Sequence, residues 1–72
     1  MTQINKENKG RRVRLIETHD KFTKLRPGDE GTYEYAIING EPPHVSIQHS
    51  IKWDSGSRLM LWGRSDKFEF IQ

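Results

Sequence analysis

Short segments of this chain alternate apolar and polar residues, and turn residues separate these segments. In segment 11–17, Val13 and Leu15 alternate with Arg12 and Arg14, which is the period of a strand with one buried face. The same period predicts four further strands, at about 32–38, 45–53, 58–62 and 67–72. Because no segment shows a helical period, the pattern predicts an all-β domain, a small and strongly bent five-stranded barrel.

Alternation also predicts which side chains point inward. Tyr33, Tyr35 and Ile37 fall on one face of segment 32–38. In a chain of 72 residues, one core must take nearly all of the large apolar side chains, because their burial has to offset the entropy lost on folding. The residues expected to meet in that core are Val13, Leu15, Ile51, Trp53, Leu59 and Phe68.

The connections carry clear turn signals. In the long polar segment 19–31, Pro27-Gly28-Asp29 predicts a turn, because proline presets φ and glycine permits a positive φ. We expect Phe22 and Leu25 to anchor this long loop to the barrel. Asn39-Gly40 predicts a type I′ hairpin turn, which needs a positive φ at both residues.

The length of 72 residues allows one domain at most. Residues 1–9 are polar and are expected to form a flexible lead-in, and residues 10–72 the domain. The absence of cysteine excludes disulfides and thiol chemistry, and the chain is too short for a cofactor crevice, so no cofactor is expected. No run approaches the roughly 20 apolar residues of a membrane span, and no signal peptide is visible. A cytoplasmic location is therefore expected.

Four segments carry a resemblance to a known family: 10–16, 23–32, 51–59, and 66–68 with Ile71. Over about residues 10–72 the chain resembles a family of small SH3-like barrel proteins found largely in phages, plasmids and other mobile elements. The turn at 53–57, Trp-Asp-Ser-Gly-Ser, is the most specific part of the match. Loop 27–31 is also similar to the KOW element of ribosomal and transcription-factor barrels, which contacts RNA or protein. The resemblance implies an SH3-like barrel with a long first loop, and no particular activity.

The chain departs from that family at two places. The stretch from Ala36 to Ser50 is longer than the family has, which predicts an extended second hairpin. His49 stands where an apolar residue is usual.

Catalytic chemistry finds no support in the pattern. A serine or threonine nucleophile needs a base within hydrogen-bonding reach, and His19, His44 and His49 are scattered. His44 and His49 fall on opposite faces of an extended segment, so they do not converge on a metal. Loop 27–31 lacks the lysine and the helix of a phosphate-binding loop. We therefore expect a binding module with no enzymatic activity and no metal.

Positive charge gathers near the N-terminus, where residues 1–14 hold five cations and one acid. If Val13 and Leu15 point inward, Arg12 and Arg14 point outward, and the planar guanidinium suits phosphates. The sequence therefore predicts nucleic-acid binding, with an aromatic ring stacking on a base. The residues expected to bind are Lys9, Arg11, Arg12, Arg14, Lys52, Arg58 and Trp62. In the alternative interpretation, Arg12 and Arg14 pair with Glu17, Glu34 or Glu69 across strands.

Segment 58–62 is apolar on both of its faces, and Met60 and Trp62 share one of them. Either Phe22 or the N-terminal tail covers these two residues, or they form an exposed patch, which on a small domain marks a partner surface. The alternative function is therefore binding of a larger host protein through Tyr35, Met60 and Trp62, or through a free edge strand. Edge strands could also join copies of the chain into a homo-oligomer.

Overall fold

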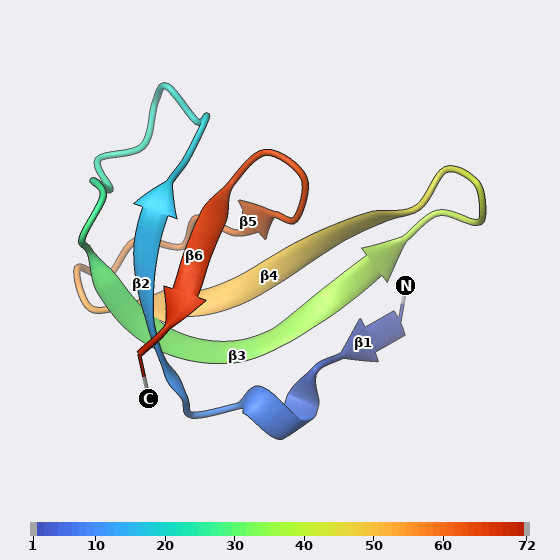
Figure 1. Cartoon of the computed structure of the whole chain (residues 1–72), viewed down its shortest axis with the longest axis horizontal. Helices are drawn as coiled ribbons and strands as arrows, with labels where there is room; N and C mark the ends of the chain where they lie inside the picture. The colour runs from blue at the N-terminus through green and yellow to red at the C-terminus, as the bar shows by residue number, and fades with distance from the viewer. Residues whose placement is uncertain (1, 72) are drawn as a thin grey trace.

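The computed structural model describes residues 2–71. They form one antiparallel sheet of six strands, which confirms the predicted all-β class. The strand order is β5-β4-β3-β2-β6, and β1 pairs with the far half of β3 (Figure 1). A single 3-10 turn, η1, lies between β1 and β2. The bounds are β1 Thr2–Ile4, η1 Lys6–Asn8, β2 Arg12–Glu17, β3 Glu30–Asn39, β4 Ser46–Trp53, β5 Leu61–Trp62 and β6 Lys67–Phe70.

The sheet is strongly curved (Figure 1). The first and last strands in its order, β5 and β6, follow each other in the chain, and the turn at 63–66 connects them. Among residues 2–71 no ladder joins β5 to β6, so the expected closed barrel is not formed and the sheet stays open. The backbone groups of Trp62 are bonded to Asp66 instead: its N–H donates to the Asp66 carboxylate, and its carbonyl accepts from the Asp66 N–H.

The core lies on the inner side of this curve. Eight hydrophobic side chains are buried there, and Leu59, Phe68 and Phe70 pack against them partly buried. The buried positions of four predicted core residues are confirmed, and Leu25 anchors the long loop as predicted. The eight are Val13, Leu15, Leu25, Tyr33, Ala36, Ile51, Trp53 and Leu61.

A bulge in β3 overturns the prediction that Tyr33, Tyr35 and Ile37 share a face. The register against β4 shifts between Tyr33 and Tyr35, which leaves Glu34 as an extra residue. Because one extra residue reverses the alternation, Tyr33 and Ala36 both point into the core.

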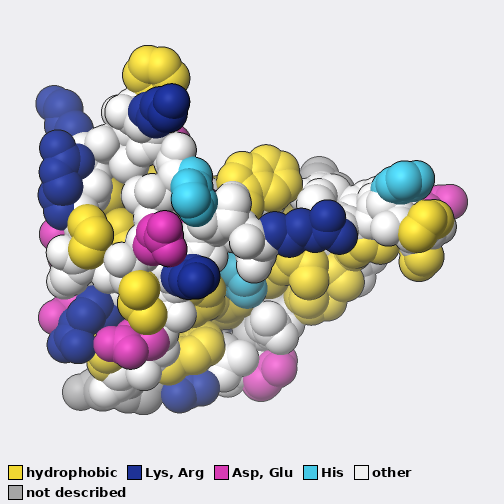
Figure 2. Space-filling model, turned by 45° about the horizontal axis from the view of Figure 1, so that its top comes forward, with side chains coloured by type: hydrophobic (Ala, Val, Ile, Leu, Met, Phe, Trp, Pro, Cys, Tyr) yellow, Lys and Arg dark blue, Asp and Glu magenta, His cyan; other side chains and the backbone are white. Residues whose placement is uncertain are grey.

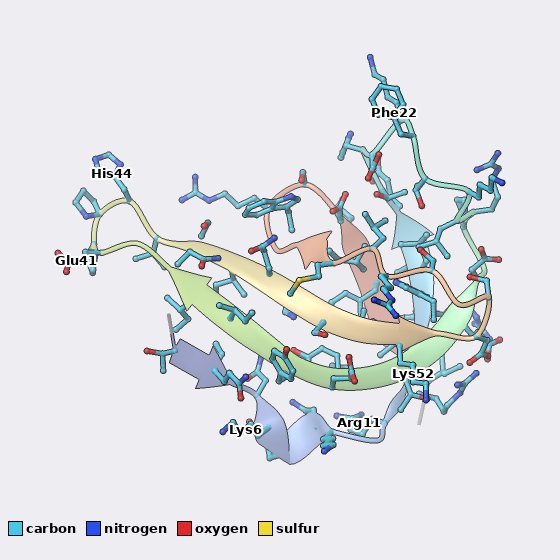
Figure 3. The ribbon with its side chains drawn as sticks, turned by 180° about the vertical axis from the view of Figure 1, so that it is seen from behind. Lys6, Arg11, Phe22, Glu41, His44 and Lys52 are labelled. Atoms are coloured by element: carbon cyan, nitrogen blue, oxygen red, sulfur yellow. The ribbon has the colours of Figure 1, made fainter. Side chains whose placement is uncertain are left out.

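The prediction that Phe22 anchors the long loop is wrong. Its side chain is 96% exposed, and Figure 3 shows it at the loop tip, away from the sheet. The Asp20 side chain accepts a hydrogen bond from the Phe22 N–H, and this local turn directs the chain outward. Leu25 alone of the two holds the loop to the core.

The β3–β4 hairpin projects from the body of the sheet, and its ladder extends through the 36–50 stretch (Figure 1). The predicted type I′ turn is not formed. Gly40 has φ +84°, whereas Asn39 is not among the residues with positive φ. The turn is instead longer, and the Glu41 carbonyl accepts a hydrogen bond from the His44 N–H inside it.

The expected lead-in over 1–9 contains two elements of the fold, β1 and η1. Thr2–Ile4 pairs with Ala36–Ile38, and η1 leads from there to β2. The edge of β3 is open at this point because β2 pairs only with residues 30–32. Met1 of the lead-in and Gln72 of the predicted domain lie outside the described residues.

Candidate functional site

Arg12 and Arg14 lie on the outer face of β2, as predicted from the inward positions of Val13 and Leu15. In the register of the sheet, Arg12 on β2 lies opposite Thr32 on β3, and Thr32 lies opposite Lys52 on β4. Three of the predicted nucleic-acid-binding cations therefore share this outer face.

Carboxylates on β3, on β6 and directly after β4 bind the two arginines. The Arg12 guanidinium donates to both carboxylate oxygens of Asp54 and lies 3.5 Å from Glu30. Arg14 lies 3.3 Å from Glu69 and 3.8 Å from Glu30. The hydrogen bonds from Arg12 hold the pKa of Asp54 below its usual value, against a smaller opposing effect of desolvation, and the pKa of Arg12 is raised in turn. The alternative interpretation is confirmed for Glu69, which pairs with Arg14. It is wrong for Glu17 and Glu34, because the other partners of the two arginines among the described residues are Glu30 and Asp54.

The remaining cations of the N-terminal end lie along the connection between η1 and β2. The Arg11 guanidinium carbon sits 4.1 Å from the centre of the Phe70 ring, and its Nη1 donates to Asn8. Lys9 is exposed at the end of η1. Figure 3 shows Lys6 at η1 and Arg11 on this connection. These residues support β6 and η1 and do not join the grooves described next.

Trp62 is 45% exposed, so neither Phe22 nor the N-terminal segment covers it. Half-buried Met60 lies between two grooves. The first, which we call the edge groove, has a volume of about 450 Å³ and runs beside β4 between Ser50–Trp53 and the segment 56–60. The second, the Trp62 groove, has about 310 Å³ and is lined by Met60, Trp62 and His19 among others. Figure 2 shows apolar side chains between basic and histidine side chains where the hairpin leaves the body.

Asp66 fixes the position of Trp62. Its side chain is buried and accepts hydrogen bonds from the Trp62 N–H at 2.8 Å, the His19 N–H at 2.9 Å and the Thr18 hydroxyl at 3.0 Å. The Asp66 N–H in turn donates to the Trp62 carbonyl. One carboxylate therefore joins the turn at 63–66 to the start of the long loop, a role that no pattern in the sequence indicates.

The predicted strand 58–62 is reduced to Leu61–Trp62, because its first residues are drawn away from β4. The Trp53 indole N–H donates to the Leu59 carbonyl at 2.9 Å, and the Leu59 N–H donates to the Ser57 hydroxyl at 3.3 Å. Only Gln48 and His49 of β4 pair with β5. The edge groove occupies the space that a continuous hairpin would have filled.

The cations beside these grooves are exposed and not neutralised. Lys52 and Arg58 line the edge groove, and Arg64 lies by a third groove beside Ile47. Among residues 2–71, none of the three has a hydrogen-bonding or ion-pair partner through its side chain. The Glu34 carboxylate also lines the edge groove, and it accepts a hydrogen bond from the Ser50 hydroxyl. Tyr35 pairs with Ser50 but lines neither named groove.

His49 occupies the inner face at the base of the hairpin, where an apolar residue was expected. Its Nδ1 is 2.9 Å from the Tyr33 hydroxyl, and its ring packs edge-on against Phe68. The Asn5 side chain also donates to the Tyr33 oxygen. Burial lowers the pKa of His49 from its ordinary value of 6.5, so the neutral ring is the form that the folded chain prefers.

We therefore expect the protein to lose stability as the pH falls from 7.5 to 5.5. The unfolded chain takes up a proton at His49 near pH 6.5, and the folded chain only at a lower pH, so the unfolded state binds more protons within this window. Thermal melting at several pH values measures the effect. His49→Gln should remove most of the pH dependence, and His44→Gln at the exposed hairpin tip should retain it. A His49→Gln variant with an unchanged pH profile would contradict this account.

Within residues 2–71, no three histidine, aspartate or glutamate side chains gather in a way that could hold a metal ion. No helix in the same residues is long and apolar enough to cross a membrane. Comparison of the chain with protein-family models, with curated proteins and with solved structures finds no match.

Proposed function

We propose that this chain is a small non-enzymatic binding module that binds a protein partner through Met60, Trp62 and the two grooves beside them. The observation that carries the proposal is the 45% exposure of Trp62 on a backbone that Asp66 holds in place. Exposed aromatic rings next to grooves are the usual anchors of protein interfaces, because they bury large apolar area with little loss of conformational freedom.

Nucleic-acid binding through the basic strand has less support. A phosphate that approaches Arg12 or Arg14 must compete with carboxylates that already bind both guanidinium groups. This second candidate is favoured instead at another place, because Lys52 and Arg58 line the edge groove, Arg64 lies by the third groove, and none of the three is paired. In that form, a single strand would stack on Trp62 and place its phosphates on these three cations.

We also propose that the domain is an opened variant of the SH3-like barrel. The curved sheet and the long loop after β2 support this, and the barrel stays open where β5 does not pair with β6. The mobile-element origin, a host-protein partner, the cytoplasmic location and a homo-oligomer through edge strands remain predictions.

The expected outcome of replacing Trp62 is a large loss of partner binding. Peptides that bind the wild-type chain can be selected from a random library, and their affinities measured by calorimetry. We expect Trp62→Ala to weaken these complexes at least about tenfold, as truncation of an aromatic anchor does. Phe22→Ala is the matched control, because Phe22 is also exposed but lies at the loop tip and lines neither groove (Figure 3).

Two results would overturn the proposal. In the first, no peptide is enriched over an unrelated protein, or the selected peptides bind Trp62→Ala as well as wild type. In the second, a single-stranded oligonucleotide binds with a steep salt dependence that Trp62→Ala and Arg58→Glu both reduce, which would establish the nucleic-acid candidate.

A further inference from the structure

The backbone of β4 presents one side to β3 and the other to the edge groove. The Ile47 carbonyl accepts a hydrogen bond from the Gly63 N–H at 2.8 Å, and the Trp53 carbonyl accepts one from the Gly56 N–H at 3.0 Å. Both bonds leave β4 on the side away from β3. Backbone groups alternate sides along a strand, so the N–H and carbonyl of Ile51, which lies between these residues, point to the same side.

The residue that should pair with Ile51 is engaged elsewhere. The β4–β5 register pairs His49 with Leu61, and its continuation would pair Ile51 with Leu59. The Leu59 carbonyl accepts from the Trp53 indole, and its N–H donates to Ser57. On the β3 side, the backbone groups of Tyr33 bond Gly10 and Arg11. Across residues 2–71, the groove-facing N–H and carbonyl of Ile51 therefore have no partner.

An open strand edge of this kind accepts an added strand. Main-chain hydrogen bonds supply the affinity of such pairing, and side-chain pockets supply its specificity. The edge groove runs along Ile51, with Met60 and Trp53 as apolar lining. Its volume of about 450 Å³ leaves room for a few residues of an extended chain.

The charges along the groove select the kind of segment. Lys52 and Arg58 are exposed beside it and carry no ion-pair partner among the described residues. The one carboxylate in the lining, that of Glu34, is turned to the Ser50 hydroxyl. An acidic segment therefore meets two unpaired cations, and a basic segment meets like charge.

We propose that the edge groove binds an extended acidic peptide segment of the partner as an added β-strand, which hydrogen-bonds to the backbone of Ile51 and places carboxylates beside Lys52 and Arg58. This inference rests on the proposed protein-binding function and names the segment that the partner contributes.

Amide hydrogen exchange of the unliganded protein provides the first test. The Ile51 N–H should exchange at least tenfold faster than that of its neighbour Lys52, which faces β3 and pairs there with Thr32. Equal protection of the two amides would mean that β4 and the 57–60 segment close into a continuous hairpin, and it would overturn the inference.

The second test adds a capped Thr-Glu-Val-Glu-Thr peptide at millimolar concentration. Exchange at Ile51 should slow at least tenfold, and a Thr-Lys-Val-Lys-Thr peptide should have no such effect. Methylation of the backbone nitrogens on one edge of the acidic peptide should abolish protection, and methylation on the other edge should leave it. Charge reversal by Lys52→Glu with Arg58→Glu should weaken binding at least tenfold, whereas Arg64→Glu, outside this groove, should not.

These outcomes separate the inference from the function on which it rests. If library-selected peptides bind in a Trp62-dependent manner but leave Ile51 exchange unchanged, the binding module stands and strand addition is wrong. If the acidic and basic peptides protect Ile51 equally, or neither protects it, the proposed occupant is wrong.

Discussion

The Asp66→Ala variant is expected to lose about 2–4 kcal/mol of the free energy of unfolding. The substitution leaves two backbone N–H groups, those of Trp62 and His19, without the acceptor that now holds them, together with the Thr18 hydroxyl. Each buried donor left unsatisfied costs about 1–3 kcal/mol. Urea denaturation measures the loss, and tryptophan emission at Trp62 reports whether the turn at 63–66 moves.

Asp66→Asn is the matched control for this prediction. The amide keeps one acceptor oxygen at nearly the same place, so the loss should be clearly smaller than for Asp66→Ala. If the two variants are equally stable, Asp66 does not organise the turn. The rigid presentation of Trp62 would then lack its physical basis.

The Leu15→Ala variant is expected to lose about 2–5 kcal/mol, since it removes a fully buried side chain and leaves a cavity. Leu15 is 1% exposed at the centre of the core cluster. A loss of this size is a large share of the stability of a domain of 72 residues. The next residue, Ile16, is 46% exposed, and Ile16→Ala should cost much less. Equal losses in chemical denaturation would place Leu15 outside the core.

Alternation along the sequence was sufficient to predict strands and the inward face of β2, β4 and β5. Val13, Leu15, Ile51 and Trp53 are buried where the period of two places them. The same rule failed in β3, because the extra residue Glu34 reverses the alternation, and no local signal in the sequence marks a bulge of this kind.

Which charged groups pair on the outer face depends on the register of the strands, and a single sequence does not reveal that register. Asp54 lies 42 residues from Arg12 along the chain, yet it receives the Arg12 guanidinium. Arg12 and Arg14, the two cations of the N-terminal end that lie on β2, are therefore paired with carboxylates in the folded sheet. Lys52 and Arg58, which are unpaired, were among the residues predicted to bind nucleic acid, but only the fold reveals the groove that they line.

The edge groove itself arises from one competition for a hydrogen-bond acceptor. A strand was predicted over 58–62. Pairing of its first residues with β4 would need the Leu59 carbonyl, which accepts a hydrogen bond from the Trp53 indole N–H instead. Sequence patterns report which face a side chain prefers, but they do not report such long-range choices of partner.

The most direct test of the central claim is to map the binding site of a library-selected peptide by ¹⁵N chemical-shift perturbation of the labelled protein. We expect the largest shifts at the backbone of Met60 and at the Trp62 indole, with little change at Arg12 and Arg14, whose side chains are bound by carboxylates. Perturbations centred on Arg12 and Arg14, with Met60 and Trp62 unaffected, would contradict it.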